Sequence, residues 1–425
     1  MNLATFARIF RAANLRNPRA DPFQASAPSA SLFSPEPSPA SSSFVVTRHL
    51  HCNSATSRDL LLLREDGEPP IASSPLFSHF LPRRRRFEVE IEEMQNCAAE
   101  NGAGLPEATK AACVEALARD QGELSRVLSI QSHVVSGYAG NKCAIFPLQI
   151  HGFEVDFINS VQFSNHTAYK HITGQRLTET ELAELYEGLK LNEIDLYSHV
   201  LTGYCGNPTF LRKIIDIVAA VKKRNPDLLF VCDPVLGDNG SYYTPKELMP
   251  IYRDEVIPFA DVLTPNVFEL QEITGRKIES EADCLEAIRE MHRKGVKIVV
   301  VTSGMFDSAE KKIMHCYASV KEEEDVFHQY RFEIPVLQGR FVGTGDVFAS
   351  LLIVWLHTYK NDIVKAVSNV IASIQGILRR TIKHAYGDKS PEDFTPSAAQ
   401  AELRLIQSRV DLLAPSIPVN YTKLI

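Results

Sequence analysis

The sequence predicts an α/β fold, with a mostly parallel central sheet, helices on both faces and an antiparallel edge. From residue 126 onward, short apolar segments rich in β-branched residues alternate with longer segments of helical periodicity. Such alternation is typical of parallel sheets whose strands are connected by helices. The segments 312–320 and 329–334 instead alternate apolar and polar residues, which predicts a hairpin at the edge of the sheet.

Each expected element follows from its own pattern. Apolar, β-branched runs predict strands at 126–131, 154–160, 197–202, 228–232, just before residue 263, and 297–302. Apolar residues spaced three or four apart predict helices at 179–191, 209–224, 279–294, 347–357, 363–384 and 398–412. The clearest strand is the run Ile298-Val299-Val300-Val301, and 279–294 is a strongly amphipathic helix.

The first 122 residues differ in composition from the rest of the chain. The segment 22–43 is rich in Ser, Pro and Ala and cannot bury enough apolar surface to offset chain entropy. We therefore expect a disordered N-terminal extension at 1–122 and one globular domain at 123–425. Residues 1–20 hold several arginines and no acid, which resembles an organelle transit peptide, and a basic disordered tail is the alternative.

Composition and charge exclude several classes of protein. The net charge of -7 argues against nucleic acid as the main partner, because phosphate backbones require a basic surface. Apolar runs in the sequence are too short to span a bilayer, so we expect no membrane association. The eight cysteines form no CxxC pair, which predicts reduced thiols and a cytoplasmic protein.

The most informative motif is the stretch Phe341-Val342-Gly343-Thr344-Gly345-Asp346-Val347-Phe348 at the start of a predicted helix. Glycines allow backbone N–H groups to approach an anion, and a helix N-terminus adds partial positive charge. The functional interpretation is a phosphate-binding turn with Asp346 as the base that takes a proton from a substrate hydroxyl. The alternative is a helix cap, because Asp and Thr are ordinary capping residues.

Polar residues also gather where the predicted strands end. The clusters are 129–133 with 137–141, 159–167, 201–204, 231–238, 264–269 and 302–304. Because the carboxyl ends of parallel strands meet at one edge of a sheet, these clusters predict a shared ligand site there. One such cluster is usually a turn, whereas several at a single edge favour a site.

Some of these residues carry oxygen atoms suited to cations and phosphates. Asp233, Asp238 and Glu269 are hard ligands for Mg²⁺ that also bridges substrate phosphates. The alternative for Asp233 is a turn residue before a proline. Thr264 and Asn266 fit a helix cap equally well, and Thr302 and Ser303 fit either a nucleotide phosphate or a strand end.

Taken in order, these motifs resemble the pyridoxal kinase family, of the eukaryotic type, within the ribokinase-like superfamily. The resemblance covers about 126–412 and includes the late helix expected at 398–412. The motifs are Ser129-Ile130-Gln131-Ser132-His133-Val134, Asn159-Ser160-Val161-Gln162-Phe163-Ser164-Asn165-His166-Thr167, Leu201-Thr202-Gly203-Tyr204, Asp233-Pro234-Val235-Leu236-Gly237-Asp238, Thr264-Pro265-Asn266 and Gly343-Thr344-Gly345-Asp346. The second motif is the most specific, because it separates this family from the hydroxymethylpyrimidine kinases.

The resemblance implies which residues bind the vitamin, which bind ATP and which take part in the transfer. On the vitamin side, a ring of the substrate would contact Ser132, Thr167, Val161, Phe163, Tyr204 and Ala139, the last being a valine in many members. Asp346 would be the base, and Gly343 and Gly345 would offer amides to the transferring phosphoryl group. ATP would lie along Asp233, Asn266, Glu269, Thr302, Ser303, Thr344 and Tyr243.

The resemblance also implies two kinds of cation. Asp238 would lie near Mg²⁺, and a monovalent cation, K⁺ or Na⁺, would lie near Asp233, Thr264, Glu269 and Thr302. The flap that animal members carry after Asp238 is shortened here to residues 239–242. We also expect a homodimer.

The function implied is ATP-dependent phosphorylation of the 5′-hydroxymethyl group of pyridoxal, pyridoxine and pyridoxamine, in the salvage of vitamin B6. One alternative is a kinase of another small alcohol, such as a hydroxymethylpyrimidine. A second is a non-catalytic vitamin-binding protein, which would need no base at position 346. An NAD-binding oxidoreductase is disfavoured, because no GxGxxG follows the first strand.

Overall fold

The computed structural model describes residues 105–118, 125–304, 312–323, 326–390 and 394–425. The expected transit-peptide-like segment and most of the expected extension lie outside these residues, as does the boundary expected near residue 122. The transit-peptide-like segment and the domain boundary near residue 122 therefore stay predictions.

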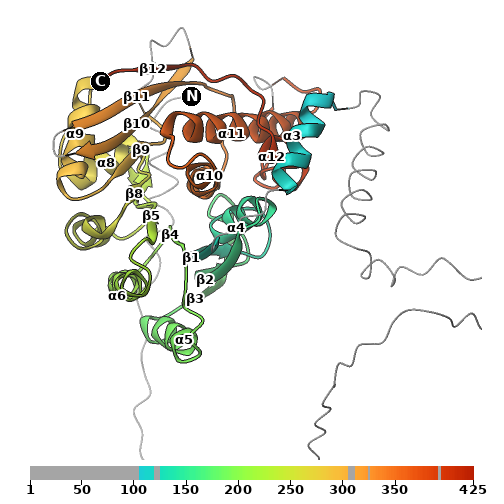
Figure 1. Ribbon diagram of the computed structural model, residues 1–425. Helices are drawn as coiled ribbons and strands as arrows, with labels where there is room; N and C mark the ends of the chain where they lie inside the picture. The colour runs from blue at the N-terminus through green and yellow to red at the C-terminus, as the bar shows by residue number, and fades with distance from the viewer. Residues whose placement is uncertain (1–104, 119–124, 305–311, 324–325, 391–393) are drawn as a thin grey trace, which may run out of the picture. The chain divides into compact units, whose positions relative to one another are not determined.

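The centre of the structure is a ten-stranded sheet with the order β12-β11-β10-β9-β8-β5-β4-β1-β2-β3 (Figure 1). Its strands are β1 (Arg126–Val134), β2 (Glu154–Phe163), β3 (Gly174–Arg176), β4 (His199–Thr202), β5 (Leu229–Cys232), β8 (Val262–Leu263), β9 (Ile298–Val301), β10 (Ile313–Glu323), β11 (Val326–Pro335) and β12 (Tyr421–Lys423). The six strands from β2 through β1, β4, β5 and β8 to β9 pair in parallel. Both ends of the sheet are antiparallel, so the predicted fold class is confirmed.

The order of the strands indicates where in the sheet a ligand would bind. Strand β2 lies on one side of β1, and the later strands β4, β5, β8 and β9 lie on its other side. The strand order therefore reverses at β1. Ligands of open α/β sheets bind outside the carboxyl ends of the strands at such a reversal. The polar clusters of the sequence lie in the carboxyl-terminal parts of β1, β2, β4, β5, β8 and β9 or just after them, and these strands are all parallel.

Helices cover both faces of the sheet. They are α3 (Glu107–Ala118), α4 (Asn141–Ile150), α5 (Glu179–Leu191), α6 (Pro208–Arg224), α7 (Leu248–Ile251), α8 (Val267–Thr274), α9 (Glu281–Arg293), α10 (Thr344–Thr358), α11 (Ile363–Tyr386) and α12 (Arg409–Leu413). Figure 1 shows α4, α10 and α11 on one face and α6, α8 and α9 on the other. Within the described residues, no helix is long and apolar enough to cross a membrane.

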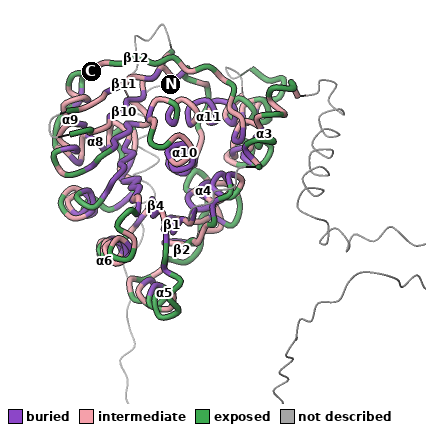
Figure 2. The backbone as a smooth tube through the Cα atoms, viewed as in Figure 1, coloured by how far each residue is buried: buried purple, intermediate pink, exposed green. Residues whose placement is uncertain are grey.

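Two apolar cores result from the alternation of side chains along the strands. On β1, Leu128 packs into the core beneath α5, α6, α8 and α9, and its neighbour Val127 packs into the core beneath α4, α10 and α11. Helix α10 is buried from Val347 to Leu356, as expected for a helix that is apolar all round. Figure 2 shows the buried backbone along the strands and through α10. The start of α10 is therefore held rigidly against the sheet.

Helix caps explain why several helices begin where they do. Thr178 and Glu181 form a capping box at the start of α5. Asn207 accepts hydrogen bonds from Thr209 and Phe210, and Pro208 occupies the first turn of α6. These caps place the starts of α5 and α6 within one residue of the predicted positions.

The structure corrects three expectations. A helix expected at 398–412 is instead a turn followed by a 3₁₀ turn at Ile406–Ser408 and the short α12. Leu403 and Leu405 are both buried, which is a spacing of two and not a helical spacing. Residues 107–118 of the expected disordered extension form α3, whose Cys113 and Ala116 pack against Leu413 of α12. The predicted hairpin β10–β11 is not the outermost edge, because β12 pairs with β11.

Candidate active site

The first turn of α10 has the geometry that its glycines predict. Gly343 precedes the helix with φ 88°, a left-handed conformation that side chains disfavour. A Cβ added there would lie 2.5 Å from the Cys143 sulfur and 3.0 Å from the Tyr138 carbonyl oxygen. The turn therefore packs directly against α4 and the loop before it.

Asp346 lies in this first turn and is bound by another element. The backbone N–H of Gly140, just before α4, donates to Asp346 Oδ2 at 2.7 Å. Burial raises the pKa of Asp346 to about 6, against the opposing effect of the Gly140 hydrogen bond. Since the amide bound to Asp346 belongs to the loop before α4, capping of its own helix does not account for this residue. A carboxylate with such a pKa is ionised at neutral pH and can still accept a proton.

On the side predicted to bind the vitamin, Ser132 lies close to Asp346. Gly140 adopts φ 56°, and a Cβ there would lie 2.0 Å from the Ser132 carbonyl oxygen and 2.4 Å from Ser132 Oγ. Across the parallel β1–β2 pair, Ser132 is level with Val161, after a register shift at Gln131. Ala139 precedes Gly140 in the same loop. The structure thus brings Ser132, Val161, Ala139 and Asp346 together around Gly140.

The remaining residues of the vitamin side lie at the ends of β2 and β4. Phe163 ends β2, and the Arg176 guanidinium carbon lies 5.2 Å from the centre of its ring. Tyr204 follows β4, and its carbonyl oxygen accepts from Ser160 Oγ at 2.7 Å. Thr167 lies on the loop after β2 and is exposed. These positions agree with a site at the carboxyl ends of β1, β2 and β4.

A buried polar network that the sequence analysis missed lies beneath these residues. Asn141, the first residue of α4, donates to the Ile158 carbonyl oxygen at 3.0 Å and to Asn159 Oδ1 at 2.9 Å. It accepts from Ser129 Oγ at 2.7 Å, and Ser129 in turn accepts from Gln131 Nε2 at 2.9 Å. The network ties the loop that carries Gly140 to β1 and β2. The adjacent polar residues in 137–141 were visible in the sequence, but their partners were not.

On the nucleotide side, Glu269 is a buried carboxylate held by backbone amides. It accepts from the N–H groups of Leu236 and Asn266, both at 2.9 Å, and more weakly from Gly237 at 3.4 Å. Burial raises the pKa of Glu269 to about 8 although these amides oppose the shift. Asn266 caps α8 and also donates to the Gly237 carbonyl oxygen at 2.8 Å. The prediction that Asn266 caps a helix is thus confirmed.

Asp233 and Thr264 leave oxygen atoms available beside Glu269. Burial, the carboxylate of Glu269 and then that of Asp346 raise the pKa of Asp233 well above its usual value. A Cβ on Gly345 would lie 3.8 Å from Asp233 Oδ2, so Asp233 faces the start of α10. The Thr264 hydroxyl is buried and has no hydrogen-bond partner. Neighbouring buried carboxylates and an unpaired hydroxyl have the chemistry of a cation site.

The other predicted nucleotide residues lie nearby along the same edge. Asp238 ends the short strand β6 (Gly237–Asp238), which forms a hairpin with β7 (Ser241–Tyr242) through Asn239 and Gly240, both with positive φ. Tyr243 follows the hairpin and is 57% exposed. Thr302 and Ser303 follow β9, with the Thr302 N–H donating to the Pro265 carbonyl oxygen and the Ser303 carbonyl oxygen accepting from the Val267 N–H. Thr344 begins α10.

No group of three or more His, Cys, Asp or Glu side chains that could hold a metal ion occurs among the residues described here. Asp233, Asp238 and Glu269 therefore do not form a complete metal cage. Mg²⁺ at phosphate-transfer sites commonly keeps several waters and takes phosphate oxygens as ligands. The donor set fits a cation that arrives with a nucleotide.

Comparison with known proteins identifies the family. The pyridoxal kinase of Ovis aries is 46% identical over 311 residues, which are 71% of this chain and 99% of the sheep protein. The chain belongs to the pyridoxal kinase family. A family member from Caenorhabditis elegans is 61% identical over 300 residues, covering 68% of this chain and 91% of its own.

Structural comparison agrees with this family. The solved structure of pyridoxal kinase from Leishmania donovani in complex with ADP and pyridoxine has a TM-score of 0.65 and 35% identity. It covers 71% of this chain and 100% of its own. A broader family described as phosphomethylpyrimidine kinase matches residues 209–391. That match contains the nucleotide side and Asp346, whereas Ser132, Val161, Phe163, Thr167 and Tyr204 lie before it.

Proposed function

We propose that this chain transfers the γ-phosphoryl group of ATP to the 5′-hydroxymethyl group of pyridoxal, pyridoxine and pyridoxamine. Membership of the pyridoxal kinase family supports the reaction. Related Leishmania donovani structures hold ADP with pyridoxine and ADP with pyridoxamine, which supports the pair of substrates. The single observation that carries the proposal is Asp346. Its partly buried carboxylate, with a raised pKa, lies in the first turn of α10.

In this mechanism, Asp346 takes the proton of the substrate hydroxyl as that oxygen attacks phosphorus. The Gly140 amide keeps the carboxylate in one orientation during the transfer. The first amides of α10 lack carbonyl partners within their own helix, so they stabilise charge on the transferring phosphoryl group. Most of the rate acceleration comes from alignment and charge stabilisation, as phosphoryl transfer requires.

The vitamin would be bound at the ends of β1, β2 and β4. The Ser132 hydroxyl would hydrogen-bond the pyridine ring, and Thr167 would contact the ring substituents. Val161, Phe163, Tyr204 and Ala139 would surround the ring. The support for this assignment is that Ser132 lies next to the Gly140 that binds Asp346, and that Val161 is level with Ser132 in the sheet.

The nucleotide and its cations would lie on the other side of Asp346. Asn266, Thr302, Ser303, Thr344 and Tyr243 would line the ATP, with Asp238 near Mg²⁺. A monovalent cation would be held by Asp233, Thr264, Glu269 and Thr302. When bound, these cations neutralise phosphate charge. The raised pKa values of Asp233 and Glu269 and the unpaired Thr264 hydroxyl support a cation there.

A kinase of hydroxymethylpyrimidine is the second candidate, and the matched family at 209–391 favours it. That match covers the phosphate-transfer machinery, which both activities share, and none of the residues assigned to the vitamin. The test is a steady-state assay of the full chain with ATP, Mg²⁺ and either pyridoxal or hydroxymethylpyrimidine. We expect pyridoxal 5′-phosphate to form with a kcat/KM at least about tenfold above that for the pyrimidine. Preference for the pyrimidine would overturn the proposal.

We also propose a cytoplasmic homodimer. In support, the end of α5 and the segment after it expose Leu185, Leu191, Ile194 and Leu196, a set of apolar side chains suited to a protein contact. Sedimentation equilibrium should give twice the chain mass, and a monomer at micromolar concentration would contradict it.

Imaging of the tagged chain with and without residues 1–20 tests the location. Import into an organelle that depends on 1–20 would favour the transit peptide.

A further inference from the structure

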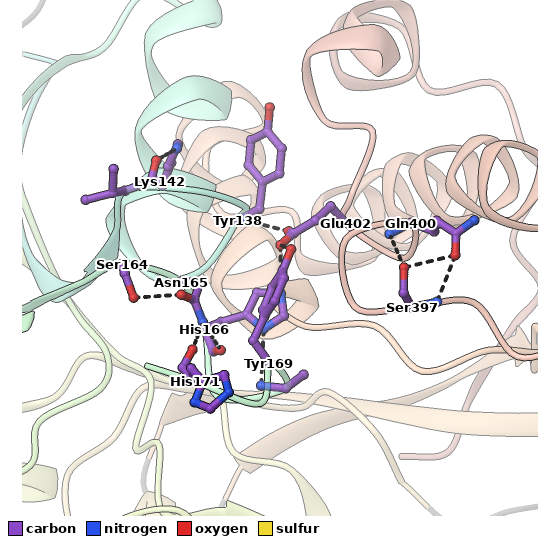
Figure 3. Close-up of polar contacts among 12 residues, drawn as sticks. Tyr138, Lys142, Ser164, Asn165, His166, Tyr169, His171, Ser397, Gln400 and Glu402 are labelled. Atoms are coloured by element: carbon purple, nitrogen blue, oxygen red, sulfur yellow. Dashed lines mark hydrogen bonds and ion pairs between the residues drawn. The ribbon is translucent and has the colours of Figure 1, made fainter. Parts of the chain in front are cut away.

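Glu402 has contacts that neither the fold nor the proposed mechanism explains. It lies on the C-terminal segment, where a helix was expected, and its side chain is 16% exposed. Its carboxylate accepts from the Tyr138 backbone N–H at 2.9 Å, the Tyr169 hydroxyl at 2.8 Å and His166 Nε2 at 3.0 Å. Figure 3 shows Tyr138 and the pair of His166 and Tyr169 converging on this carboxylate from separate parts of the chain.

The three donors belong to two loops beside the active site. Loop 1 (residues 135–140) contains Tyr138 and ends at Gly140, whose amide binds Asp346. Loop 2 (residues 164–173) contains His166 and Tyr169 on either side of Thr167. One carboxylate therefore binds both the loop that orients the base and the loop assigned to the vitamin.

The fit of loop 1 against Glu402 requires a glycine. Gly137 adopts φ 82°, and a Cβ at this position would lie 2.0 Å from Glu402 Oε1. A side chain here would have to displace the carboxylate. The close approach of backbone to carboxylate is therefore built into loop 1.

His166 is oriented by a second hydrogen bond. The N–H of Ala168 donates to His166 Nδ1 at 3.3 Å, so the proton of the neutral ring lies on Nε2 and points at Glu402. The ring is 6% exposed and packs 4.9 Å from the Tyr169 ring, measured between centroids. Loop 2 therefore presents its two donors to Glu402 as one unit.

Glu402 is charged under physiological conditions. Burial raises its pKa, but hydrogen bonds from His166, Tyr169 and Tyr138 outweigh burial and hold the pKa below its usual value. Hydrogen bonds to an ionised carboxylate are stronger than those between neutral groups. On the same segment, Leu403 and Leu405 are buried in the core beneath α10 and α11, so the position of Glu402 is anchored independently of the loops.

We propose that Glu402 is a positioning residue for the vitamin substrate, with its carboxylate clamping loop 1 to loop 2. The C-terminal segment thereby completes the vitamin side without touching the substrate. This inference rests on the proposed function. It predicts that loss of Glu402 weakens the binding of the vitamin and leaves the nucleotide side, which it does not contact, nearly unchanged.

The test compares Glu402→Ala and Glu402→Gln with Gln400→Ala in the full chain. Gln400 is the matched control, because its Oε1 accepts from Ser397 N–H and Oγ within the same segment and reaches neither loop. We expect Glu402→Ala to raise KM for pyridoxal about tenfold, with KM for ATP within about threefold. Glu402→Gln keeps an acceptor for Tyr138 but loses the charge, so its effect should be intermediate. Gln400→Ala should match the wild type.

A second measurement does not depend on activity. Hydrogen exchange of peptides that contain Tyr138 and residues 164–173 should be faster in both Glu402 variants than in the wild type and in Gln400→Ala. Unchanged exchange, or KM values for ATP and pyridoxal that rise together, would overturn the clamp. Should Glu402→Ala not fold, the same criteria apply to Glu402→Gln. A wild-type chain that does not phosphorylate pyridoxal would overturn the proposed function, and exchange would still test the clamp.

Discussion

The two sides of Asp346 are built on opposite electrostatic principles. On the nucleotide side, Asp233 and Glu269 are buried with raised pKa values, and the Thr264 hydroxyl beside them is unpaired. On the vitamin side, the carboxylate of Glu402 has three donors and a lowered pKa. One side thus has carboxyl groups whose ionised form the surrounding protein disfavours, and the other has an ionised carboxylate that the protein stabilises with its own hydrogen bonds.

This difference indicates how each side recognises its ligand. Ionisation of buried carboxyl groups destabilises the empty protein, and a bound cation offsets that cost, so such groups favour the binding of cations with a nucleotide. The carboxylate of Glu402 is instead occupied by three donors from the protein, and it holds in place the two loops that we propose surround the vitamin. Under the proposed function, recognition on the nucleotide side would therefore be mainly electrostatic, and on the vitamin side mainly a matter of shape.

The largest expected effect comes from Asp346, where the two sides meet. Asp346→Asn should lower kcat by roughly 10²–10⁴, the usual contribution of a positioned base. Folding and ATP binding should persist, because the asparagine oxygen can still accept from Gly140. Steady-state kinetics and ATP titration measure both effects. Turnover close to that of the wild type would show that Asp346 is not the base.

On the nucleotide side, Asp233→Asn should lower activity and raise the stability of the ligand-free protein. We expect kcat/KM to fall by about 10–100-fold, through weaker cation and nucleotide binding. The ligand-free variant should be more stable than the wild type at neutral pH. Because the folded-state pKa of Asp233 is raised, the wild type loses stability as pH rises from the unfolded-state value through the folded-state value. Melting temperatures from pH 4 to pH 8 test this, and a difference that shrinks as pH rises would contradict it.

The pH dependence of kcat/KM should have an acid limb set by Asp346. The base works in its ionised form, and the pKa of Asp346 is about 6 in the free protein. Activity should therefore fall about tenfold per pH unit below that value. The limb should disappear from the residual activity of Asp346→Asn. Activity that stays flat down to pH 5 would argue against this assignment.

Ser132→Ala and Thr302→Ala should each raise KM for a different substrate. A neutral buried hydrogen bond contributes about 0.5–1.5 kcal/mol, so each change should raise one KM several-fold. Ser132→Ala should affect pyridoxal, and Thr302→Ala should affect ATP. If both variants weaken ATP alone, Ser132 does not bind the vitamin, and the choice of a pyridine substrate loses support.

The smallest effect is expected from the N-terminus. A chain that begins at Met94 keeps α3 and should differ from the full chain by less than about twofold in kcat/KM. A chain that begins at residue 123 loses α3, exposing Leu413 and its neighbours, so its melting temperature should be lower. Equal stability of the two shortened chains would show that α3 adds nothing to the domain. Loss of activity in the folded Met94 chain would show that the extension takes part in catalysis.

Much of the fold could be predicted because its signals are local. The run Ile298–Val301 and the periodicity of α5, α6 and α9 are visible within single windows of sequence. The helix expected at 398–412 was wrong because its apolar residues suited either spacing, and long-range contacts decided the outcome. Glu402 binds a backbone amide 264 residues away, which no local pattern encodes.

The site residues show the same limit. Their types and their places after strands were predictable, and the structure brings Ser132, Val161 and Asp346 together around Gly140. The importance of Gly140, Asn141 and Glu402 was not predictable, since each acts through a partner from another element. Roles that depend on the residue itself can be predicted from sequence, whereas roles that depend on a partner require the fold.

The late position of Glu402 has a consequence for the order in which the protein is made. Tyr138 and Glu402 are separated by 264 residues. At about 5–20 residues per second, a ribosome needs roughly 13–53 s to travel between them. For that time, loops 1 and 2 have been synthesised without the carboxylate that joins them. A nascent chain can build most of its sheet and α10 before that point, but the two loops can be joined only after residue 402 has been made.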